Sequence, residues 1–299
     1  MYSTPILFLI FNKPDSIRKV FDQIRKIQPQ RLYIAADGPR RNRIGEEDLC
    51  IQAREVIDSV DWPCTIQTLF REKNFGCKKA VSEAISWFFE QEEYGVILEE
   101  DCLPDLSFFP FCEELLIKYK DDDRIGHIGG NCFLPGVVKD GLSYDFCSIT
   151  HIWGWATWRR VWKNVEVDFP FWIKYKKRRS SLFCNKWEEI YFTSFISDAL
   201  SHKNGLNPWA VFYYYSLRLQ HQLSIYPAVN MVSNIGLNDT NATHTLKASS
   251  KLYVPAQKMN FPLQHPDFVM DNKTINRKAV LNNFFSYKRL VRYIFDMYF

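Results

Sequence analysis

Three consecutive acidic residues, Glu99, Glu100 and Asp101, follow the short apolar run 96–98. Adjacent carboxylates repel one another at neutral pH, so a fold that gathers them needs a cation or strong hydrogen-bond donors beside them. Mg²⁺ and Mn²⁺ prefer oxygen ligands and commonly take one or two carboxylates, which leaves positions for water and phosphate oxygens. The triplet therefore predicts a divalent-metal site that also binds a nucleotide diphosphate. The alternative is an acidic loop that only faces water.

The elements that must position these acids alternate along the first third of the chain. Apolar runs predict strands at 5–11, 31–36, 65–70 and 96–98, and amphipathic patterns predict helices at 14–27, 46–60 and 77–91. This β-α-β order predicts an α/β fold with a mostly parallel, doubly wound sheet and helices on both faces. The acids then lie at the end of the fourth strand.

Other polar residues also follow predicted strands directly. Asn12, Asp37 and Arg71 come after the first three strands, as the acids come after the fourth. Open α/β sheets bind ligands beyond the carboxyl ends of their strands, so these side chains are expected to line one nucleotide cleft. The sequence contains neither a P-loop nor a glycine-rich dinucleotide fingerprint after the first strand. We therefore expect metal and side chains to hold the phosphates.

Composition narrows the class of protein. The 299 residues are 46% hydrophobic, and a formal charge of +4 is spread along the chain, so nucleic acid is not an expected partner. The eight cysteines form no C-x-x-C pair, which favours reduced thiols in a cytoplasmic protein. No apolar run is long enough to span a bilayer, and no cleavable leader is evident.

The second half is richer in aromatic residues and less regular. A strand is predicted at 125–130, a loop entering a helix at 152–160, a helix at 186–200, helix or strand at 211–219, and a short strand at 225–227. We expect one domain over 1–248, divided into a nucleotide-sugar-binding half (1–130) and an acceptor-side half (131–248). Residues 249–299 form a C-terminal extension with a basic amphipathic segment.

Five motifs, in this order, resemble those of the GT-A nucleotide-diphospho-sugar transferases. They lie at 35–39, 71–77, 98–102, 153–158 and 234–236 followed by 243–245, and together they cover roughly residues 4–246. The resemblance is closest to the bacterial group often labelled hemolytic-protein-like, which is similar to the eukaryotic transferase that adds N-acetylglucosamine to N-glycan cores. It implies a GT-A (Rossmann-like) fold with an aromatic-rich, acceptor-side C-terminal half.

The resemblance also implies roles for individual residues. Asp101 would be the direct ligand of Mn²⁺ or Mg²⁺, His244 would approach the metal or the diphosphate, and Glu99 would lie near the donor sugar as a catalytic residue. The set expected to bind the nucleotide sugar is Asn12, Asp37, Arg71, Asn74, Glu100 and Trp155. For each residue a structural role is the alternative: Asp37 in a tight turn, Arg71 on the surface, His244 as a hydrogen-bonding residue, and Trp155 as packing between the second half and the sheet.

The general base is where this chain departs from the resemblance. Related sequences often carry Asp directly after Trp where this chain has Ala210. Inverting transfer needs a base to deprotonate the acceptor hydroxyl. Asp239 and Asp198 are the catalytic candidates, with Glu188 and Glu189 as further nearby carboxylates. A retaining or weakly active enzyme remains an alternative.

The function implied is a metal-dependent glycosyltransferase that moves a sugar from a UDP-sugar or similar donor to a glycan or lipid-linked glycan in bacterial surface polysaccharide synthesis. A sugar nucleotidyltransferase is less favoured, because residues 11–15 lack a glycine- and Lys/Arg-rich phosphate loop. A glycan-binding or scaffold protein that lost its base is the non-enzyme alternative. The basic, apolar segment 284–299 is expected either to lie on the inner face of an anionic membrane or to form a helix that docks on the domain or in an oligomer interface.

Overall fold

The computed structural model describes residues 1–167, 182–183, 185–200, 209–238, 254–284, 287, 290–291 and 293–294. Within these ranges, the side chains of 198–199, 237–238 and 283–284 lie outside the description.

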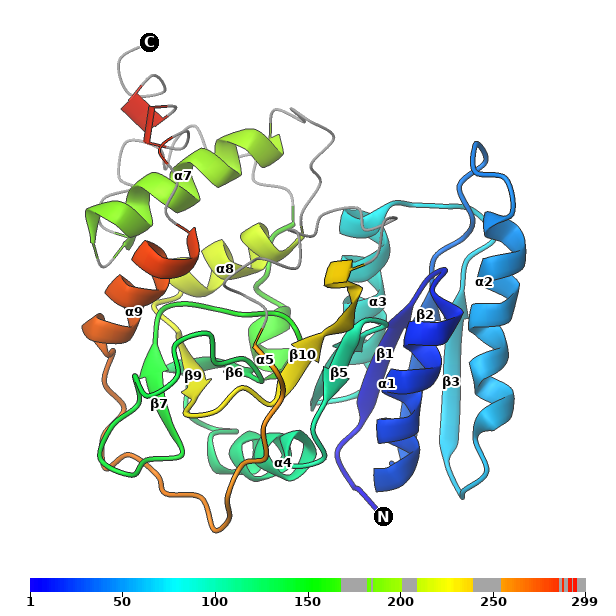
Figure 1. Cartoon of the computed structure of the whole chain (residues 1–299), viewed down its shortest axis with the longest axis horizontal. Coiled ribbons are helices and arrows are strands. Elements are labelled where there is room, and N and C mark those ends of the chain that lie inside the picture. Colours follow the sequence, from blue (N-terminus) through cyan, green and yellow to red (C-terminus); the bar gives the residue numbers. More distant parts are fainter. Residues whose placement is uncertain are drawn as a thin grey trace.

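The N-terminal part is a parallel sheet with helical crossovers (Figure 1). Its elements are β1 (Ile6–Ile10), α1 (Pro14–Ile27), β2 (Arg31–Ala36), α2 (Glu46–Arg54), the 3₁₀ turn η1 (Glu55–Ser59), β3 (Thr65–Phe70), α3 (Cys77–Gln91) and β4 (Tyr94–Glu99). The strands are ordered β3-β2-β1-β4, so the chain runs outward from β1 to β3 and then returns to the other side of β1. The strand order therefore reverses between β1 and β4, at the position where open α/β sheets bind ligands.

Local sequence explains why these elements form. Strand β1 is buried at all five positions, as expected for a central parallel strand covered on both faces. Helix α1 begins at Pro14, whose fixed φ suits the first helical position. Its buried apolar side chains recur at helical spacing, at Ile17, Val20, Phe21 and Ile24.

The second part extends the same sheet. Strands β8, β6, β9 and β7 follow β4 in the sheet, and six of the eight strands run in one direction, with only β7 and β8 reversed. The remaining elements are β5 (Cys102–Pro104), α4 (Phe108–Lys118), β6 (Ile125–Gly129), β7 (Tyr144–Cys147), β8 (Trp155–Trp158), α5 (Arg159–Trp162), α7 (Lys186–Leu200), α8 (Ala210–Leu219), β9 (Leu223–Pro227), β10 (Val232–Asn234), the 3₁₀ turn η4 (Ile235–Asn238), α9 (Lys273–Ala279) and the π-helical turn η5 (Val280–Phe284). The predicted α/β fold with a mostly parallel sheet is confirmed.

Two predictions for the second half are corrected or resolved. Residues 155–158 form strand β8 rather than a loop, because they insert antiparallel between β4 and β6. The segment 211–219, which the pattern left open between helix and strand, is helix α8. Helix α4 is not predicted by the sequence pattern, because it contains Pro110 and its run of aromatic residues hides the helical period.

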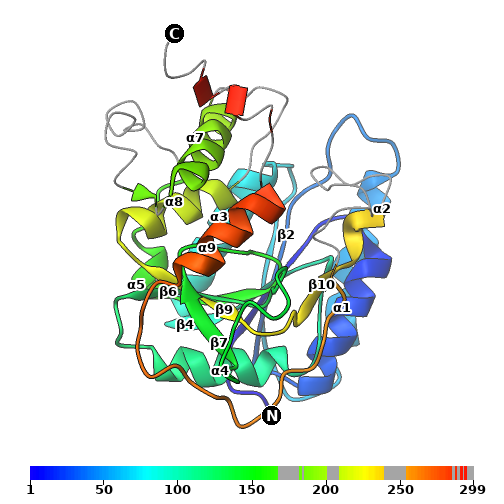
Figure 2. The ribbon, with the colours of Figure 1, turned by 60° about the vertical axis from the view of Figure 1, so that its left-hand side comes forward.

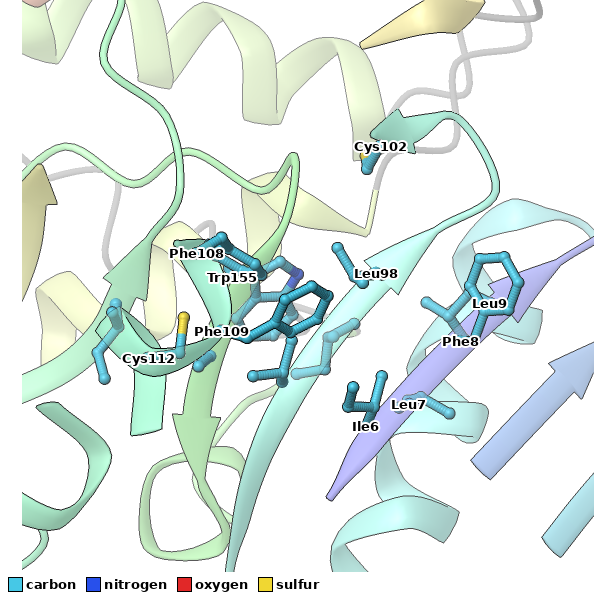
Figure 3. Close-up of a cluster of buried hydrophobic side chains, with 14 of the residues drawn as sticks. Ile6, Leu7, Phe8, Leu9, Leu98, Cys102, Phe108, Phe109, Cys112 and Trp155 are labelled. Atoms are coloured by element: carbon cyan, nitrogen blue, oxygen red, sulfur yellow. The ribbon is translucent and has the colours of Figure 1, made fainter. Parts of the chain in front are cut away.

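One continuous core joins the two halves. Phe8 and Leu98 from the first half pack in the same buried cluster as Trp155, together with Phe108 and Phe109 of α4 (Figure 3). The predicted boundary at residue 130 therefore crosses a shared core, and the division into a nucleotide-sugar-binding half and an acceptor-side half stays a prediction.

The described part of the C-terminal extension packs on both halves, since the Met259 N–H donates to Ser107 Oγ at 2.8 Å in the first half and α9 lies on the second half. Figure 2 shows α9 beside α7 and α8. Farther along, the Tyr293 hydroxyl lies 2.6 Å from Glu189 Oε1 and 2.7 Å from Lys186 Nζ, both on α7. The contacts of Tyr293 agree with the alternative in which the C-terminal segment docks on the domain. Most of residues 284–299 lie outside the described residues. Among the described residues no helix is long and apolar enough to cross a membrane.

Candidate functional site

The predicted acids lie beside the point where strand order reverses. Glu99 is the last residue of β4, and Glu100 and Asp101 form the turn that leads to β5. Facing them across the reversal is the exit of β1, residues 11–13, which leads directly into α1.

The Glu100 side chain links the exits of β1 and β4. Its Oε2 accepts a hydrogen bond of 2.6 Å from the backbone N–H of Phe11. The side chain is buried, and this burial is the main reason that the pKa of Glu100 is raised to about 7, with Lys13 and the backbone hydrogen bond acting to lower it. In this structure Glu100 joins the exits of β1 and β4, and its expected part in binding the nucleotide sugar stays a prediction.

Asp101 is held by contacts from two directions. Its Oδ2 lies 3.1 Å from Lys13 Nζ, and its backbone carbonyl accepts a 2.8 Å hydrogen bond from the N–H of Ile235. Gly236 packs so closely that an added Cβ would overlap the Asp101 carboxylate. The motif at 234–236 therefore does meet the acidic motif, and a side chain larger than glycine at Gly236 would displace the Asp101 carboxylate.

Glu99 has a buried oxygen with no hydrogen-bond partner among the described residues, Oε1. Desolvation, followed by repulsion from Asp101 and Glu100, raises the pKa of Glu99 to about 8. A buried carboxylate oxygen without a donor is unfavourable unless a cation or donor satisfies it.

These carboxylates fit a hard divalent cation. Asp101 and Glu99 supply oxygen donors, and one or two carboxylates are what Mg²⁺ and Mn²⁺ commonly take when water and phosphate oxygens complete the shell. Within the described residues no group of three or more His, Cys, Asp or Glu side chains is arranged to hold a metal by itself. A metal would therefore need ligands from outside these side chains.

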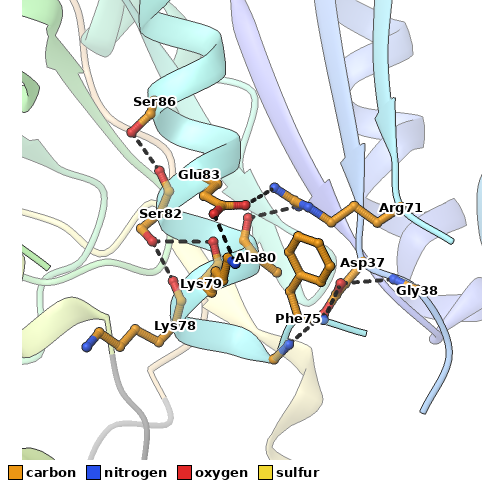
Figure 4. A network of polar contacts seen from close by, with 11 residues as sticks. Asp37, Gly38, Arg71, Phe75, Lys78, Lys79, Ala80, Ser82, Glu83 and Ser86 are labelled. Atoms are coloured by element: carbon orange, nitrogen blue, oxygen red, sulfur yellow. Dashed lines mark hydrogen bonds and ion pairs between the residues drawn. The ribbon is translucent and has the colours of Figure 1, made fainter. Parts of the chain in front are cut away.

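Asp37 organises the next loop along the same edge (Figure 4). Its carboxylate accepts hydrogen bonds from the backbone N–H groups of Phe75 at 2.9 Å and of Gly76 and Gly38 at 3.0 Å. Asn74 Nδ2 donates to the carbonyl of Gly38 at 2.7 Å. The two predicted residues are thus brought together, and both shape the loop that begins α3.

Replacing Asp37 by Ala is expected to lower the free energy of unfolding by about 1–3 kcal/mol, because several backbone donors lose their acceptor. Asp37→Asn keeps one acceptor oxygen and is expected to lose less. Urea unfolding of both variants measures the effect. Equal stability of Asp37→Ala and the wild type would show that this carboxylate does not hold the loop.

Arg71 points toward α3. Its guanidinium lies 3.0 Å from Glu83 Oε2, donates to the carbonyl of Ala80 and stands over the Phe75 ring (Figure 4). Arg54, which the sequence did not single out, donates to the backbone carbonyls of Asp37 and Arg71. Both arginines brace the loop in this structure, and the phosphate contact expected of Arg71 stays a prediction.

Asn12 is likewise engaged with the scaffold. Its Nδ2 donates at 2.9 Å to Oε1 of the buried Glu46, which also accepts from Arg40. Glu46 was not singled out from the sequence, since an acid in the first turn of a helix has an ordinary capping explanation.

Trp155 lies in the core, as its packing alternative predicts. It is completely buried, with its ring stacked on Trp209 at 5.7 Å and in contact with Tyr213 at 4.8 Å. In this structure Trp155 has no surface on which a nucleotide sugar could stack.

The structure does not describe the side chains of three predicted residues. Asp239 and His244 fall outside the described residues, and Asp198 lies on α7 with its side chain outside them. Ala210, which stands where the sequence resemblance leads us to expect Asp, is the first residue of α8.

Comparison with known proteins gives distant similarities only. No family model and no curated protein matches the chain. Among solved structures, the mannosyltransferase PcManGT from Pyrobaculum calidifontis, in complex with GDP-Man and Mn²⁺, shows 12% identity and a TM-score of 0.38 over 73% of this chain and 70% of that one. TarS from S. aureus shows 11% identity and a TM-score of 0.37, over 56% and 50%. A cytidylyltransferase from Leptospira borgpetersenii shows 12% and 0.34, over 59% and 74%. Similarity at this level transfers no substrate to this chain.

Proposed function

We propose that this protein is a metal-dependent glycosyltransferase of the GT-A type, which moves a sugar from a nucleotide-diphosphate donor to a glycan or lipid-linked glycan acceptor. The observation that carries the proposal is the buried Oε1 of Glu99 beside Asp101, which has no hydrogen-bond partner among the described residues and lies at the reversal of strand order between β1 and β4. An acidic site at that position is suited to a cation and an anionic nucleotide rather than to structural packing.

In this proposal the residues divide into three groups. Asp101 and Glu99 hold the divalent ion, Mn²⁺ or Mg²⁺, with His244 as a further ligand. The nucleotide lies along the loops that Asn12, Asp37, Asn74 and Glu100 shape. When bound, the cation would stabilise the negative charge on the departing diphosphate. The base that deprotonates the acceptor is Asp239 or Asp198, with Glu99 close to the donor sugar.

The proposed nucleotide, family group and pathway rest on the five sequence motifs. They favour UDP as the nucleotide, the hemolytic-protein-like group as the nearest relatives, and surface polysaccharide synthesis as the pathway. A lipid-linked acceptor accords with a peripheral position at a membrane through the C-terminal segment, where Val291 and Ile294 are exposed.

Identifying the products of a donor panel tests this proposal. The protein is incubated with UDP-, GDP- and CDP-sugars and Mn²⁺ or EDTA, and separately with nucleoside triphosphates and sugar phosphates. A glycosyltransferase without its acceptor is expected to hydrolyse its donor slowly and release a nucleoside diphosphate only with Mn²⁺. Release of pyrophosphate from the triphosphates would instead identify a nucleotidyltransferase. Absence of both products and of nucleotide binding would favour the scaffold alternative.

A further inference from the structure

Lys13 lies at the reversal of strand order, and its backbone is fixed. It is the residue immediately before α1, its carbonyl accepts a 3.0 Å hydrogen bond from the N–H of Ile17, and its own N–H donates to Glu100. The neighbouring Phe11 N–H is also bound to Glu100. The base of the Lys13 side chain is therefore anchored to the acidic turn that its ammonium faces.

The Lys13 ammonium pairs with the residue expected to bind the metal. Nζ lies 3.1 Å from Asp101 Oδ2, and the two side chains are only 19% and 16% exposed. An ion pair shielded to this degree is stronger than a surface pair, because water screens it less. The partners are 88 residues apart in sequence, so the contact depends on the fold.

Other basic groups along this edge have different partners. Arg40 pairs with Glu46, and Arg71 pairs with Glu83. Within the described residues, the Lys13 pair is the only ion pair that reaches the acidic triplet. Lys13 thus supplies the positive charge that lies against Asp101 in this structure.

We propose that Lys13 is a switching residue: it neutralises Asp101 in the ligand-free protein and binds the donor diphosphate once Asp101 holds a divalent cation. This proposal rests on the proposed function. An ammonium and a divalent ion repel each other at one carboxylate, so Asp101 binds one or the other. A lysine is a compact, mobile cation on a long stem, which suits it to move from a carboxylate to a neighbouring phosphate.

The proposal predicts two effects of opposite sign for Lys13→Met, which removes the charge and keeps much of the stem. Affinity for Mn²⁺ without nucleotide is expected to rise about three- to tenfold, because the competing ammonium is gone. Affinity for the nucleoside diphosphate at saturating Mn²⁺ is expected to fall about tenfold or more, because a charge-assisted contact is lost. Lys13→Arg is expected to keep most of the diphosphate affinity.

Mn²⁺ binding is measured from the electron paramagnetic resonance signal of the free ion, and UDP, GDP and CDP binding by calorimetry. Lys19→Met, an exposed lysine on α1, is the matched control and is expected to change neither affinity. Thermal unfolding of each variant confirms that it is folded.

Each possible result of these binding measurements either supports or overturns the switching role of Lys13. Unchanged Mn²⁺ and nucleotide affinities in Lys13→Met would overturn the proposal and leave Lys13 with only a structural role in the loop. Weaker Mn²⁺ binding by Lys13→Met would also overturn it. If the wild type binds Mn²⁺ but no nucleoside diphosphate, the proposed function fails, whereas the Mn²⁺ comparison still tests the competition at Asp101. If the wild type binds neither, both fail.

Discussion

The Asp101→Asn protein is expected to release nucleoside diphosphate from its donor at least about a hundredfold more slowly than the wild type in the presence of Mn²⁺. The amide keeps the size of the side chain but removes the negative charge that would hold the cation. The leaving diphosphate then loses electrostatic stabilisation where its charge develops. Rates are measured on the donor that the product panel identifies.

Two observations make this variant informative. Asp101 sits in a fixed position, held through its carbonyl by Ile235 and packed against Gly236, so the substitution is not expected to move the turn. Asp61→Asn is a matched control, because Asp61 precedes β3 at the opposite end of the strands and pairs with Arg25 on the surface. A loss of less than about threefold in Asp101→Asn would remove this carboxylate from the metal site.

Glu99→Gln is expected to stabilise the metal-free protein and to abolish its stabilisation by Mn²⁺. The wild-type carboxylate leaves Oε1 buried without a partner among the described residues. A neutral amide avoids the desolvation of a charge, and a gain on the order of 1–2 kcal/mol is expected at pH 8. In a chain of this size that corresponds to a rise of about 2–6 °C in melting temperature.

The pH dependence of this effect has a definite sign. The pKa of Glu99 in the folded protein is raised to about 8, above its ordinary value of 4.5. Between these values the folded state keeps a proton that the unfolded state has released, so this group's contribution to stability falls as the pH rises toward 8. In EDTA, the stability of the Glu99→Gln protein is therefore expected to fall less steeply than that of the wild type as the pH rises toward 8.

Melting curves from pH 5 to 9, in EDTA and in Mn²⁺, test both expectations. Glu83→Gln, an exposed carboxylate on α3, is the control for removing a charge, although it also loses the pair with Arg71. A Glu99→Gln protein that melts below the wild type in EDTA would show that the Glu99 carboxylate is already satisfied in the ligand-free protein.

Much of the first half of the fold could be predicted because its signals are local. The predicted bounds 14–27, 31–36, 65–70 and 77–91 coincide with α1, β2, β3 and α3. The parallel order then follows from alternation of strands and helices, and it brings the exits of β1, β2, β3 and β4 to one edge. Hydrogen bonds from Phe11 to Glu100 and from Phe75 to Asp37 show that these exits do meet.

The direction in which each side chain points could not be predicted in the same way. Arg71 follows β3 as expected, yet it turns toward Glu83 because α3 brings that acid within reach. Trp155 is in a tryptophan-rich motif whose pattern predicts a loop, but Trp209, immediately before α8, and Tyr213 of α8 bury it. Such contacts depend on elements that are far apart in sequence, so no local pattern reports them.

Lys13 illustrates the same limit at the site itself. In the sequence it is an ordinary lysine before a proline, and the absence of a glycine-rich loop directs attention away from it. Only the meeting of β1 and β4 shows that its ammonium faces Asp101. A cation within reach of the acidic turn is therefore a result of the fold.

Calorimetric titration of the wild-type protein with UDP, GDP and CDP, with and without Mn²⁺, shows whether the exit of β4 binds a metal ion and a nucleotide together. We expect one of these nucleotides to bind in Mn²⁺, with an affinity that falls at least about tenfold in EDTA and in Asp101→Asn. Equal affinity in Mn²⁺, in EDTA and in Asp101→Asn would contradict a metal and nucleotide site at the exit of β4, as would the absence of any binding.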